Sequence, residues 1–183
     1  QASGDWAKSA EVLSQIAQKL EQAGADFIVI CTNTMHKVAP QIQKQIAIPI
    51  LHIAQATAEA ILENGIQKVG LLGTKYTMTQ DFYKEKLLEA GLEVLIPDQA
   101  GITEVNRIIY DELCLGDIKD SSKQTYLTII DDLKNAGAKA VILGCTEIGL
   151  LVKQADTDLL LYDTTAIHAQ KAAELAINGW LLC

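Results

Sequence analysis

The sequence lacks the features that mark several common classes of protein. Its 183 residues hold 15 Lys and Arg against 23 Asp and Glu, a formal net charge of −8, and no basic cluster occurs along the chain. Binding of nucleic acid or of a membrane surface needs such a cluster, so we expect neither partner. No apolar run approaches the roughly 18 residues of a membrane span, and no basic-then-apolar leader is present. We therefore expect a soluble, cytoplasmic protein.

The cysteines show no metal-binding pattern. There is no CxxC pair and no histidine beside a cysteine at the spacing of metal ligands, so we expect no metal site. In a cytoplasmic setting thiols stay reduced, and each cysteine is then either a small buried hydrophobic residue or a reactive group. The four are Cys31, Cys114, Cys145 and Cys183.

Apolar runs alternate with helix-like segments along the chain. The strand-like runs are DFIVICT, IPILHI, KVGLLGT, EVLIPD, KAVILGCT and DLLLYDTT. This alternation is typical of βαβ units with a parallel sheet. A first helix is expected from about residue 5 to residue 23, followed by Gly24 as a cap, and a later helix should stop at Gly137. Their predicted buried faces are Leu13, Ile16, Ala17 and Leu20 in the first, and Ile129, Ile130 and Leu133 in the second.

Two of these segments repeat each other. IAQKLEQAGADFIVICTNT, from residue 16, aligns with IIDDLKNAGAKAVILGCTE, from residue 129, at a constant offset of 129 − 16 = 113. In this register Cys145 lies opposite Thr32, and Cys31 lies opposite Gly144. A looser pairing, which needs gaps, relates IPILHIAQATAEAILENG to DLLLYDTTAIHAQKAAELAING. Such a repeat indicates two equivalent halves.

We therefore predict an α/β fold of two pseudo-symmetric lobes, each built on a parallel sheet. The first lobe should comprise residues 1–66 and 160–183, and the second residues 67–159. Equivalent strand ends from the two lobes would meet in the cleft between them, which is the natural place for a ligand.

Polar groups presented from opposite lobes suit a reaction that needs one group on each face of a carbon atom. Racemisation is such a reaction, because one group removes the α-proton and the other returns a proton from the opposite side. A thiolate is a workable base, and Cys145 lies at a strand end where a helix N-terminus should lower its pKa. Asn33 and Thr146 are natural helix caps, and the amides of their loops can hold a carboxylate.

Five strings carry a family resemblance: ICTNTMH, IPILHIAQAT, VGLLGTKYTMTQDFY, ILGCTEIGLL and DTTAIHAQKAA. Together they resemble the aspartate/glutamate racemase family, which works without pyridoxal phosphate, and the resemblance covers nearly the whole chain. It implies two α/β lobes with the active site between them, two cysteines as the acid/base pair, an acidic amino acid as substrate and no cofactor. Because family members are often dimers, it also allows a homodimer.

The first motif departs from the usual Cys-Asn-Thr of the family, because Thr32 occupies the place of the cysteine. A one-residue step on a strand turns a side chain to the other face, so we predict that Thr32, rather than Cys31, faces Cys145. A bulge at the strand end would present Cys31 instead. We expect Cys145 to act as the base on the L enantiomer and Thr32 to return the proton, directly or through a water. The substrate's α-carboxylate and amino group are expected to be held by Asn33, Thr34 and Thr146.

Two further departures affect the substrate and the extent of the chain. Some aspartate racemases carry a lysine for the side-chain carboxylate where this chain has Cys114, so glutamate or broader substrates are also expected; Cys114 itself should be a buried helix residue. The Gly-rich first strand and the arginine-bearing segment of the family are absent, and we expect at least one βαβ unit of ~30 residues ahead of Gln1. The alternatives are another cysteine-dependent reaction of the superfamily (hydantoin racemase, maleate isomerase or malonate decarboxylase) and a catalytically weak amino-acid-binding protein.

The remaining polar candidates have ordinary structural explanations. VGLLGTKYT lacks the Lys-Ser/Thr of a P-loop, so we interpret it as the turn that opens the second lobe, with Thr74 or Thr77 near the substrate. Glu147 either orients the site or favours a helix N-terminus. Capping or core positions are expected for His36, His52 and His168.

Overall fold

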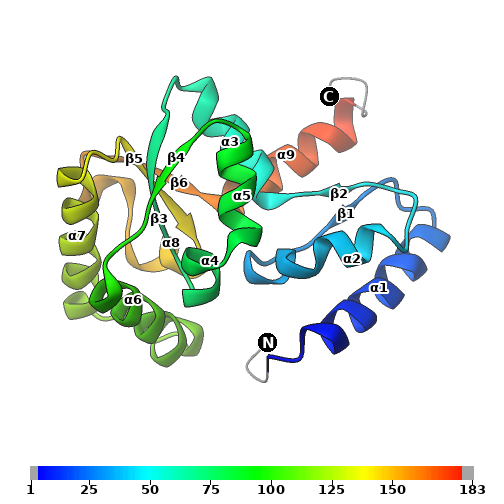
Figure 1. The fold of residues 1–183 in the computed structure, drawn as a ribbon, viewed down its shortest axis with the longest axis horizontal. Helices are drawn as coiled ribbons and strands as arrows, with labels where there is room; N and C mark the ends of the chain where they lie inside the picture. The colour runs from blue at the N-terminus through cyan, green and yellow to red at the C-terminus, as the bar shows by residue number, and fades with distance from the viewer. Residues whose placement is uncertain (1–3, 179–183) are drawn as a thin grey trace.

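The computed structural model describes residues 4–178, which form two bodies of unequal size joined side by side (Figure 1). All six expected strands are present. The smaller body contains α1 (Trp6–Gln22), β1 (Ile28–Val29), η1 (Thr34–Val38), α2 (Ala39–Gln43) and β2 (Ile50–Leu51), and α3 (Ile53–Glu63) follows it. The larger body contains β3 (Lys68–Gly73), α4 (Lys75–Thr79), α5 (Asp81–Glu89), β4 (Glu93–Leu95), α6 (Gln99–Asp111), η2 (Leu113–Leu115), α7 (Asp120–Asn135), β5 (Ala140–Gly144), α8 (Ile148–Leu151), η3 (Gln154–Asp156) and β6 (Leu160–Asp163), and α9 (Thr164–Asn178) ends the described chain.

The strands form two parallel sheets, as predicted. β1 pairs with β2, and the larger sheet has the strand order β4-β3-β5-β6. The lobe boundary expected at residue 160 needs a correction, because β6 pairs with β5 from Ala140 opposite Leu160 to Leu143 opposite Asp163. This strand therefore belongs to the sheet of the larger body. The rest of the division into residues 1–66 and 67–159 stays a prediction.

The larger sheet is buried on both faces. Alternate residues of its central strands point to opposite sides, so Leu72 and Leu143 pack among the residues of α6, α7 and α8, whereas Leu71 and Ile142 pack among those of α3 and α5. Strands covered on both sides need continuous apolar runs, and VGLLG and AVILG provide them. The predicted face of α7 is confirmed, since Ile129, Ile130 and Leu133 are all buried.

The smaller body is less completely covered. Helix α1 ends before Gly24, whose φ of +92° is the left-handed conformation that glycine adopts readily at a helix end. Ala17 is buried against the two-stranded sheet, but Ile16 and Leu20 are each 47% exposed, so the predicted apolar face is only partly buried. A sheet of two strands offers too little surface to cover the whole apolar face of α1.

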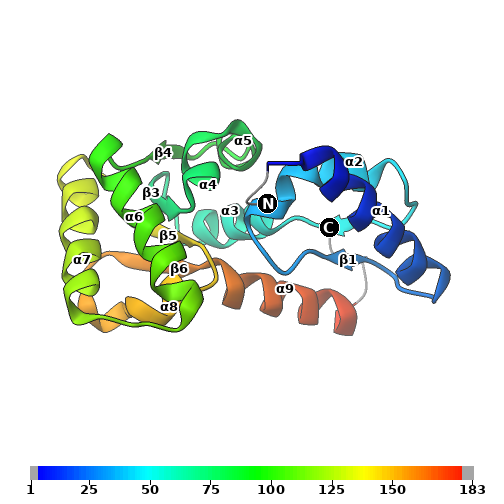
Figure 2. The same ribbon diagram turned by 90° about the horizontal axis from the view of Figure 1, so that it is seen from below.

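Helices α3 and α9 join the two bodies. They follow the equivalent strands β2 and β6 and pack against each other, with an ion pair of 3.0 Å between Lys171 and Glu59. Helix α9 runs from the larger sheet along the underside of the smaller body (Figure 2). His168 on α9 donates a hydrogen bond through Nε2 to the carbonyl oxygen of Leu51 at 2.8 Å. Within residues 4–178 no helix is both long and apolar enough to cross a membrane.

Candidate functional site

The C-terminal ends of β1, β3 and β5 meet at a cavity of about 100 Å³ between the two bodies. In parallel α/β proteins this end of the sheet is the usual place for a ligand. All five residues predicted for the site contribute to the cavity wall. The lining residues are Thr32, Asn33, Thr34, Thr74, Ile109, Tyr110, Cys114, Gly144, Cys145, Thr146 and Glu147.

Thr32 lies in the cavity wall, and Cys31 does not. The chain turns sharply after β1, with the amide of Thr32 donating to the carbonyl oxygen of Ile30 at 2.8 Å. The thiol of Cys31 is exposed and points back toward the carbonyl oxygen of Val29, 4.0 Å from Sγ. Thr32 and Cys145 therefore face the same cavity from different bodies, in the register of the internal repeat.

Asn33 holds the β1 loop against the larger body. Thr164 donates its single hydroxyl proton to the carbonyl oxygen of Leu143 at 2.9 Å, so the Asn33 atom that contacts the Thr164 oxygen at 3.0 Å is the donor Nδ2. Asn33 Oδ1 is then left buried without a partner among the described residues. The expected cap is absent, because the Asn33 side chain makes no capping bond to η1.

Threonine hydroxyls link the bodies beside this loop. Thr34 Oγ1 lies 3.1 Å from Thr74 Oγ1, which lies 3.2 Å from Thr77 Oγ1. Thr74 caps α4 by accepting a hydrogen bond from the Thr77 amide at 3.3 Å. Of Thr74 and Thr77, which we expected near the substrate, Thr74 lines the cavity. VGLLG, which we also interpreted as a turn, is the strand β3, as its strand-like run indicates.

The Cys145 thiol donates to a carboxylate. Its Sγ lies 3.0 Å from Glu147 Oε2, which also accepts a hydrogen bond of 2.7 Å from Thr146 Oγ1. Burial, then this hydrogen bond and the charge of Glu147, raise the pKa of the Cys145 thiol well above its ordinary value. Burial also opposes the charge on Glu147, but the hydrogen bonds from Cys145, Thr146 and its own backbone amide outweigh it and leave the Glu147 pKa below its ordinary value.

The predicted lowering of the Cys145 pKa by a helix N-terminus is therefore wrong for the free protein. Helix α8 has only four residues and begins three residues after Cys145. The expected cap is also absent, since Glu147 rather than Thr146 holds the N-cap position and makes no side-chain capping bond. A nearby full negative charge outweighs a short helix terminus.

A third wall comes from the α6–η2 corner, which the family resemblance indicated only at position 114. Ile109, Tyr110 and Cys114 line the cavity here. Cys114 was expected to be a buried helix residue, but it is exposed on η2. The corner is a sharp turn, with Gly116 at a φ of +77°, and it turns Cys114 toward the cavity.

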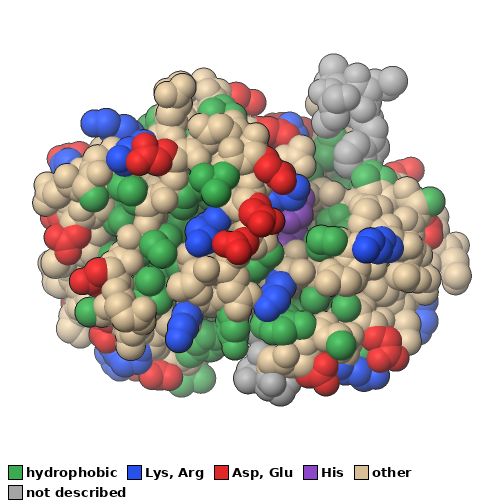
Figure 3. All heavy atoms as spheres, viewed as in Figure 1, with side chains coloured by type: hydrophobic (Ala, Val, Ile, Leu, Met, Phe, Trp, Pro, Cys, Tyr) green, Lys and Arg blue, Asp and Glu red, His purple; other side chains and the backbone are tan. Residues whose placement is uncertain are grey.

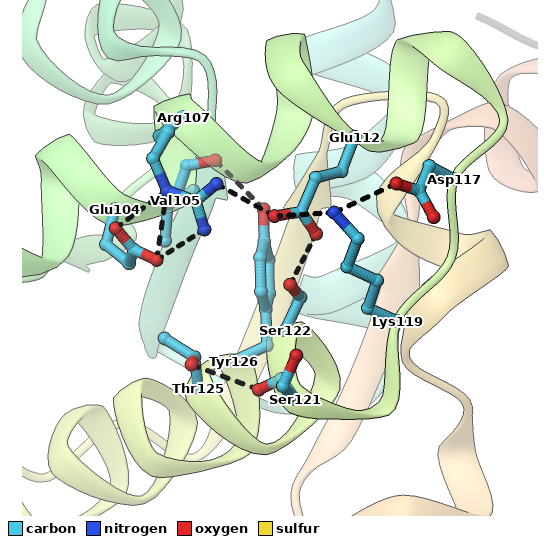
Figure 4. A network of polar contacts seen from close by, with 10 residues as sticks. All are labelled: Glu104, Val105, Arg107, Glu112, Asp117, Lys119, Ser121, Ser122, Thr125 and Tyr126. Atoms are coloured by element: carbon cyan, nitrogen blue, oxygen red, sulfur yellow. Dashed lines mark hydrogen bonds and ion pairs between the residues drawn. The ribbon is translucent and has the colours of Figure 1, made fainter.

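A polar network anchors this corner (Figure 4). The Glu112 carboxylate is buried and accepts hydrogen bonds from the Ser122 hydroxyl and from Arg107 Nη1, the latter at 2.8 Å. Lys119 adds an ion-pair contact at 3.7 Å. These bonds hold the pKa of Glu112 below its ordinary value. The network ties the end of α6 to the start of α7 and so fixes the turn that carries Cys114.

The three histidines form a cluster behind the β1 loop. The ring centroid of His36 lies 4.5 Å from that of His52 and 5.8 Å from that of His168. His36 accepts the Ile53 amide at Nε2 (3.2 Å), which leaves Nδ1 as the donor to the carbonyl oxygen of Thr32 at 2.8 Å. His52 caps α3. The prediction of capping and core roles is confirmed, and histidine surface is visible between the two bodies in Figure 3.

Each histidine is held neutral by its surroundings. Burial lowers the pKa of His36 to about 4 and that of His52 to about 3, and it also lowers the pKa of His168. Among residues 4–178 no group of His, Cys, Asp and Glu side chains has an arrangement that could hold a metal ion.

The fold and the placement of polar groups at equivalent strand ends define a two-lobed α/β protein with a cavity at the junction. A family model described as Asp/Glu/hydantoin racemase matches residues 1–172, and the chain belongs to this family.

Two solved structures share the fold of this chain, and a further relative matches it in sequence. A putative Asp/Glu racemase from Yersinia pestis has a TM-score of 0.91 at 51% identity, covering 97% of this chain and 77% of that one. An aspartate racemase homologue from Pyrococcus horikoshii OT3 has a TM-score of 0.85 at 41% identity, covering 94% and 76%. The broad specificity amino-acid racemase RacX of Bacillus subtilis (strain 168) is 26% identical over 156 residues, 84% of this chain and 66% of that protein. The chain thus spans slightly under two thirds of RacX.

Proposed function

We propose that the protein is a cofactor-independent amino-acid racemase that acts on aspartate, glutamate or related amino acids. The observation that carries the proposal is that Thr32 and Cys145, one from each body, line the same small cavity. Membership of the racemase family supports the same reaction class. A homodimer and a cytoplasmic setting stay predictions.

The proposed reaction moves one proton on each side of the α-carbon. The Cys145 thiolate removes the α-proton of the L enantiomer and becomes a thiol, while the electron pair passes into the α-carboxylate. The Thr32 hydroxyl, directly or through a water, gives a proton to the opposite face, and the resulting alkoxide or hydroxide recovers a proton from solvent. The D enantiomer is then released.

The remaining wall residues are placed to hold the α-substituents. Asn33 Oδ1 is a buried acceptor without a partner, which suits an ammonium donor. The Thr34 and Thr146 hydroxyls can rotate to donate to the carboxylate, which becomes more negative as the α-proton leaves. These roles are our proposal for the residues predicted from the sequence.

Chiral analysis of product tests the proposal. Full-length protein is incubated with L- and D-aspartate, L- and D-glutamate and a panel of neutral amino acids, and the opposite enantiomer is measured by chiral chromatography. We expect interconversion that ends at equal amounts of the two enantiomers, because they have equal free energies. Cys31→Ser serves as a matched control and should retain activity, since the Cys31 thiol lies outside the cavity wall. No interconversion with any substrate would contradict the proposal.

A further inference from the structure

Glu147 has a contact pattern that acid/base chemistry at Cys145 and Thr32 does not by itself explain. It is the one charged side chain in the part of the cavity wall formed by residues 4–178. The two side chains that donate to it, Cys145 through Sγ and Thr146 through Oγ1, both contact the same oxygen, Oε2. Both donors are neutral, so no cationic side chain among the described cavity-lining residues balances the negative charge of Glu147.

An amino acid brings the complementary charge. Its α-ammonium group is a cation with three donors, and the cavity offers an anionic acceptor at Glu147 and a buried acceptor without a partner at Asn33 Oδ1. We propose that Glu147 binds the substrate's α-ammonium group and that, in the free enzyme, it keeps Cys145 protonated by accepting the thiol hydrogen bond. This inference rests on the proposed function, in which Cys145 is the base.

The two roles are coupled through one oxygen. An ammonium group at Glu147 cancels its charge and competes for Oε2, which removes two of the causes that raise the thiol pKa, although burial remains. The thiol proton then passes to solvent, and the thiolate is formed where the α-proton arrives. The other titratable groups facing this pair are Cys114 on η2, Tyr110 on α6 and Tyr126 on α7. Burial raises the pKa of Cys114 and of Tyr126, so both are neutral at pH 7, and the charge that acts on the thiol is that of Glu147.

This arrangement makes substrate recognition part of base formation. Without an amine in the cavity the thiol stays protonated, and a thiol reacts with electrophiles and oxidants far more slowly than a thiolate. A carboxylic acid that lacks the amino group would enter the cavity without forming the base.

The first test is independent of racemase activity. The full-length protein is treated with iodoacetamide from pH 6 to pH 10, and alkylation of each cysteine is followed by peptide mass spectrometry. The thiolate displaces iodide, so the rate reports the thiolate fraction. In Glu147→Gln, Cys145 should react about tenfold faster at pH 8, which corresponds to a pKa lower by about one unit. In Glu147→Asp, which keeps the negative charge, Cys145 should be alkylated nearly as slowly as in wild type.

Controls separate the charge from a general disturbance. Alkylation of the exposed Cys31 should be the same in all variants, and Glu104→Gln, which removes a carboxylate outside the cavity wall, should leave Cys145 unchanged. Equal Cys145 rates in wild type and Glu147→Gln, with a folded protein by circular dichroism, would overturn the coupling.

The second test measures recognition of the amine. 2-Aminoisobutyrate has an ammonium group but no α-proton. Isobutyrate has no ammonium group, and its α-carbon carries two methyl groups and is achiral, so neither compound can be racemised. Calorimetry should give at least about tenfold weaker binding of 2-aminoisobutyrate to Glu147→Gln than to wild type, and no change for isobutyrate. Equal loss for both ligands, or no loss for either, would overturn ammonium binding. If the variant behaves as expected while wild type racemises nothing, the inference about Glu147 stands and the proposed function fails.

Discussion

Acidification should destabilise the protein through the buried histidine cluster, and His36 allows the size of the effect to be worked out. The side chain is 1% exposed, and burial lowers its pKa to about 4 from an ordinary value of 6.5. Below pH 6.5 the unfolded chain binds a proton that the folded chain excludes. The stabilising contribution is therefore complete above pH 6.5 and falls as the pH drops toward 4. Between pH 7.5 and pH 5 it decreases by about 2 kcal/mol for this one group.

The assay is urea unfolding at pH 7.5 and pH 5 for wild type and His36→Gln. The change with pH is the quantity compared, because lost ring packing lowers stability at both pH values. We expect the free energy of unfolding of wild type to fall by about 2 kcal/mol more than that of His36→Gln over this interval. Carboxylates titrate in both proteins and cancel. His168→Gln should change the pH dependence in the same direction, since its pKa is also lowered.

If the free energy of unfolding had the same pH dependence in wild type and His36→Gln, burial would not lower the pKa of His36. That result would mean that the His36 ring takes up a proton in the folded protein, although Nε2 accepts the Ile53 amide and Nδ1 donates to the Thr32 carbonyl. Protonation at Nε2 would break the first of these bonds and set the new Nε2–H donor against the N–H donor of Ile53.

Three further predictions concern the site and its support. Thr32→Cys should raise the rate constant kcat for the D-to-L reaction by about tenfold or more. In that direction residue 32 removes the α-proton, and a thiol, as the stronger acid, ionises more readily than a hydroxyl. Chiral chromatography would measure the rate, and unchanged kinetics in both directions would count against the role of Thr32. Glu112→Gln should lower the free energy of unfolding by about 2 kcal/mol, because it loses the charge-assisted bonds to Ser122 and Arg107 (Figure 4). Glu104→Gln, at the exposed end of the same network, should lower it by less than about 1 kcal/mol. Urea unfolding measures both losses, and equal losses would contradict this prediction. Gly144→Ala places a Cβ 2.8 Å from the Leu72 carbonyl oxygen, which is backbone. It should lower the melting temperature more than Gly70→Ala, whose shortest Cβ contact, also 2.8 Å, is with the flexible end of the Leu133 side chain.

The sequence predicted the fold because its signals are strong and local. Apolar runs such as AVILG can be buried on both faces only as central parallel strands, and β5 is one. The internal repeat related Thr32 to Cys145, and both line the cavity. The position of β6 was not predicted, because lobe membership depends on which strand edge it joins rather than on its own residues.

Apart from position 114, which the family resemblance indicated, the third wall of the site could not be predicted from sequence, and neither could the protonation state of Cys145. Tyr110 and Cys114 occupy a helix end and a short turn, and their direction depends on the Glu112 network, whose members Glu104 and Ser122 are 122 − 104 = 18 residues apart. The sequence placed Glu147 next to Thr146, but only the folded loop brings its Oε2 within 3.0 Å of the thiol. Sequence spacing alone favoured a lowered thiol pKa, and a specific charge contact reversed it.

Exchange of the substrate α-proton in D₂O shows directly whether Cys145 removes that proton. Full-length wild type and Cys145→Ser are incubated with each enantiomer of aspartate and glutamate, and with any amino acid found to be racemised, and loss of the α-proton signal is followed by NMR. We expect deuterium incorporation in wild type and its loss by a factor of about 10² or more in Cys145→Ser, with the L enantiomer most affected. Undiminished exchange in Cys145→Ser, or none in wild type, would contradict the assignment of Cys145 as the base of a racemase.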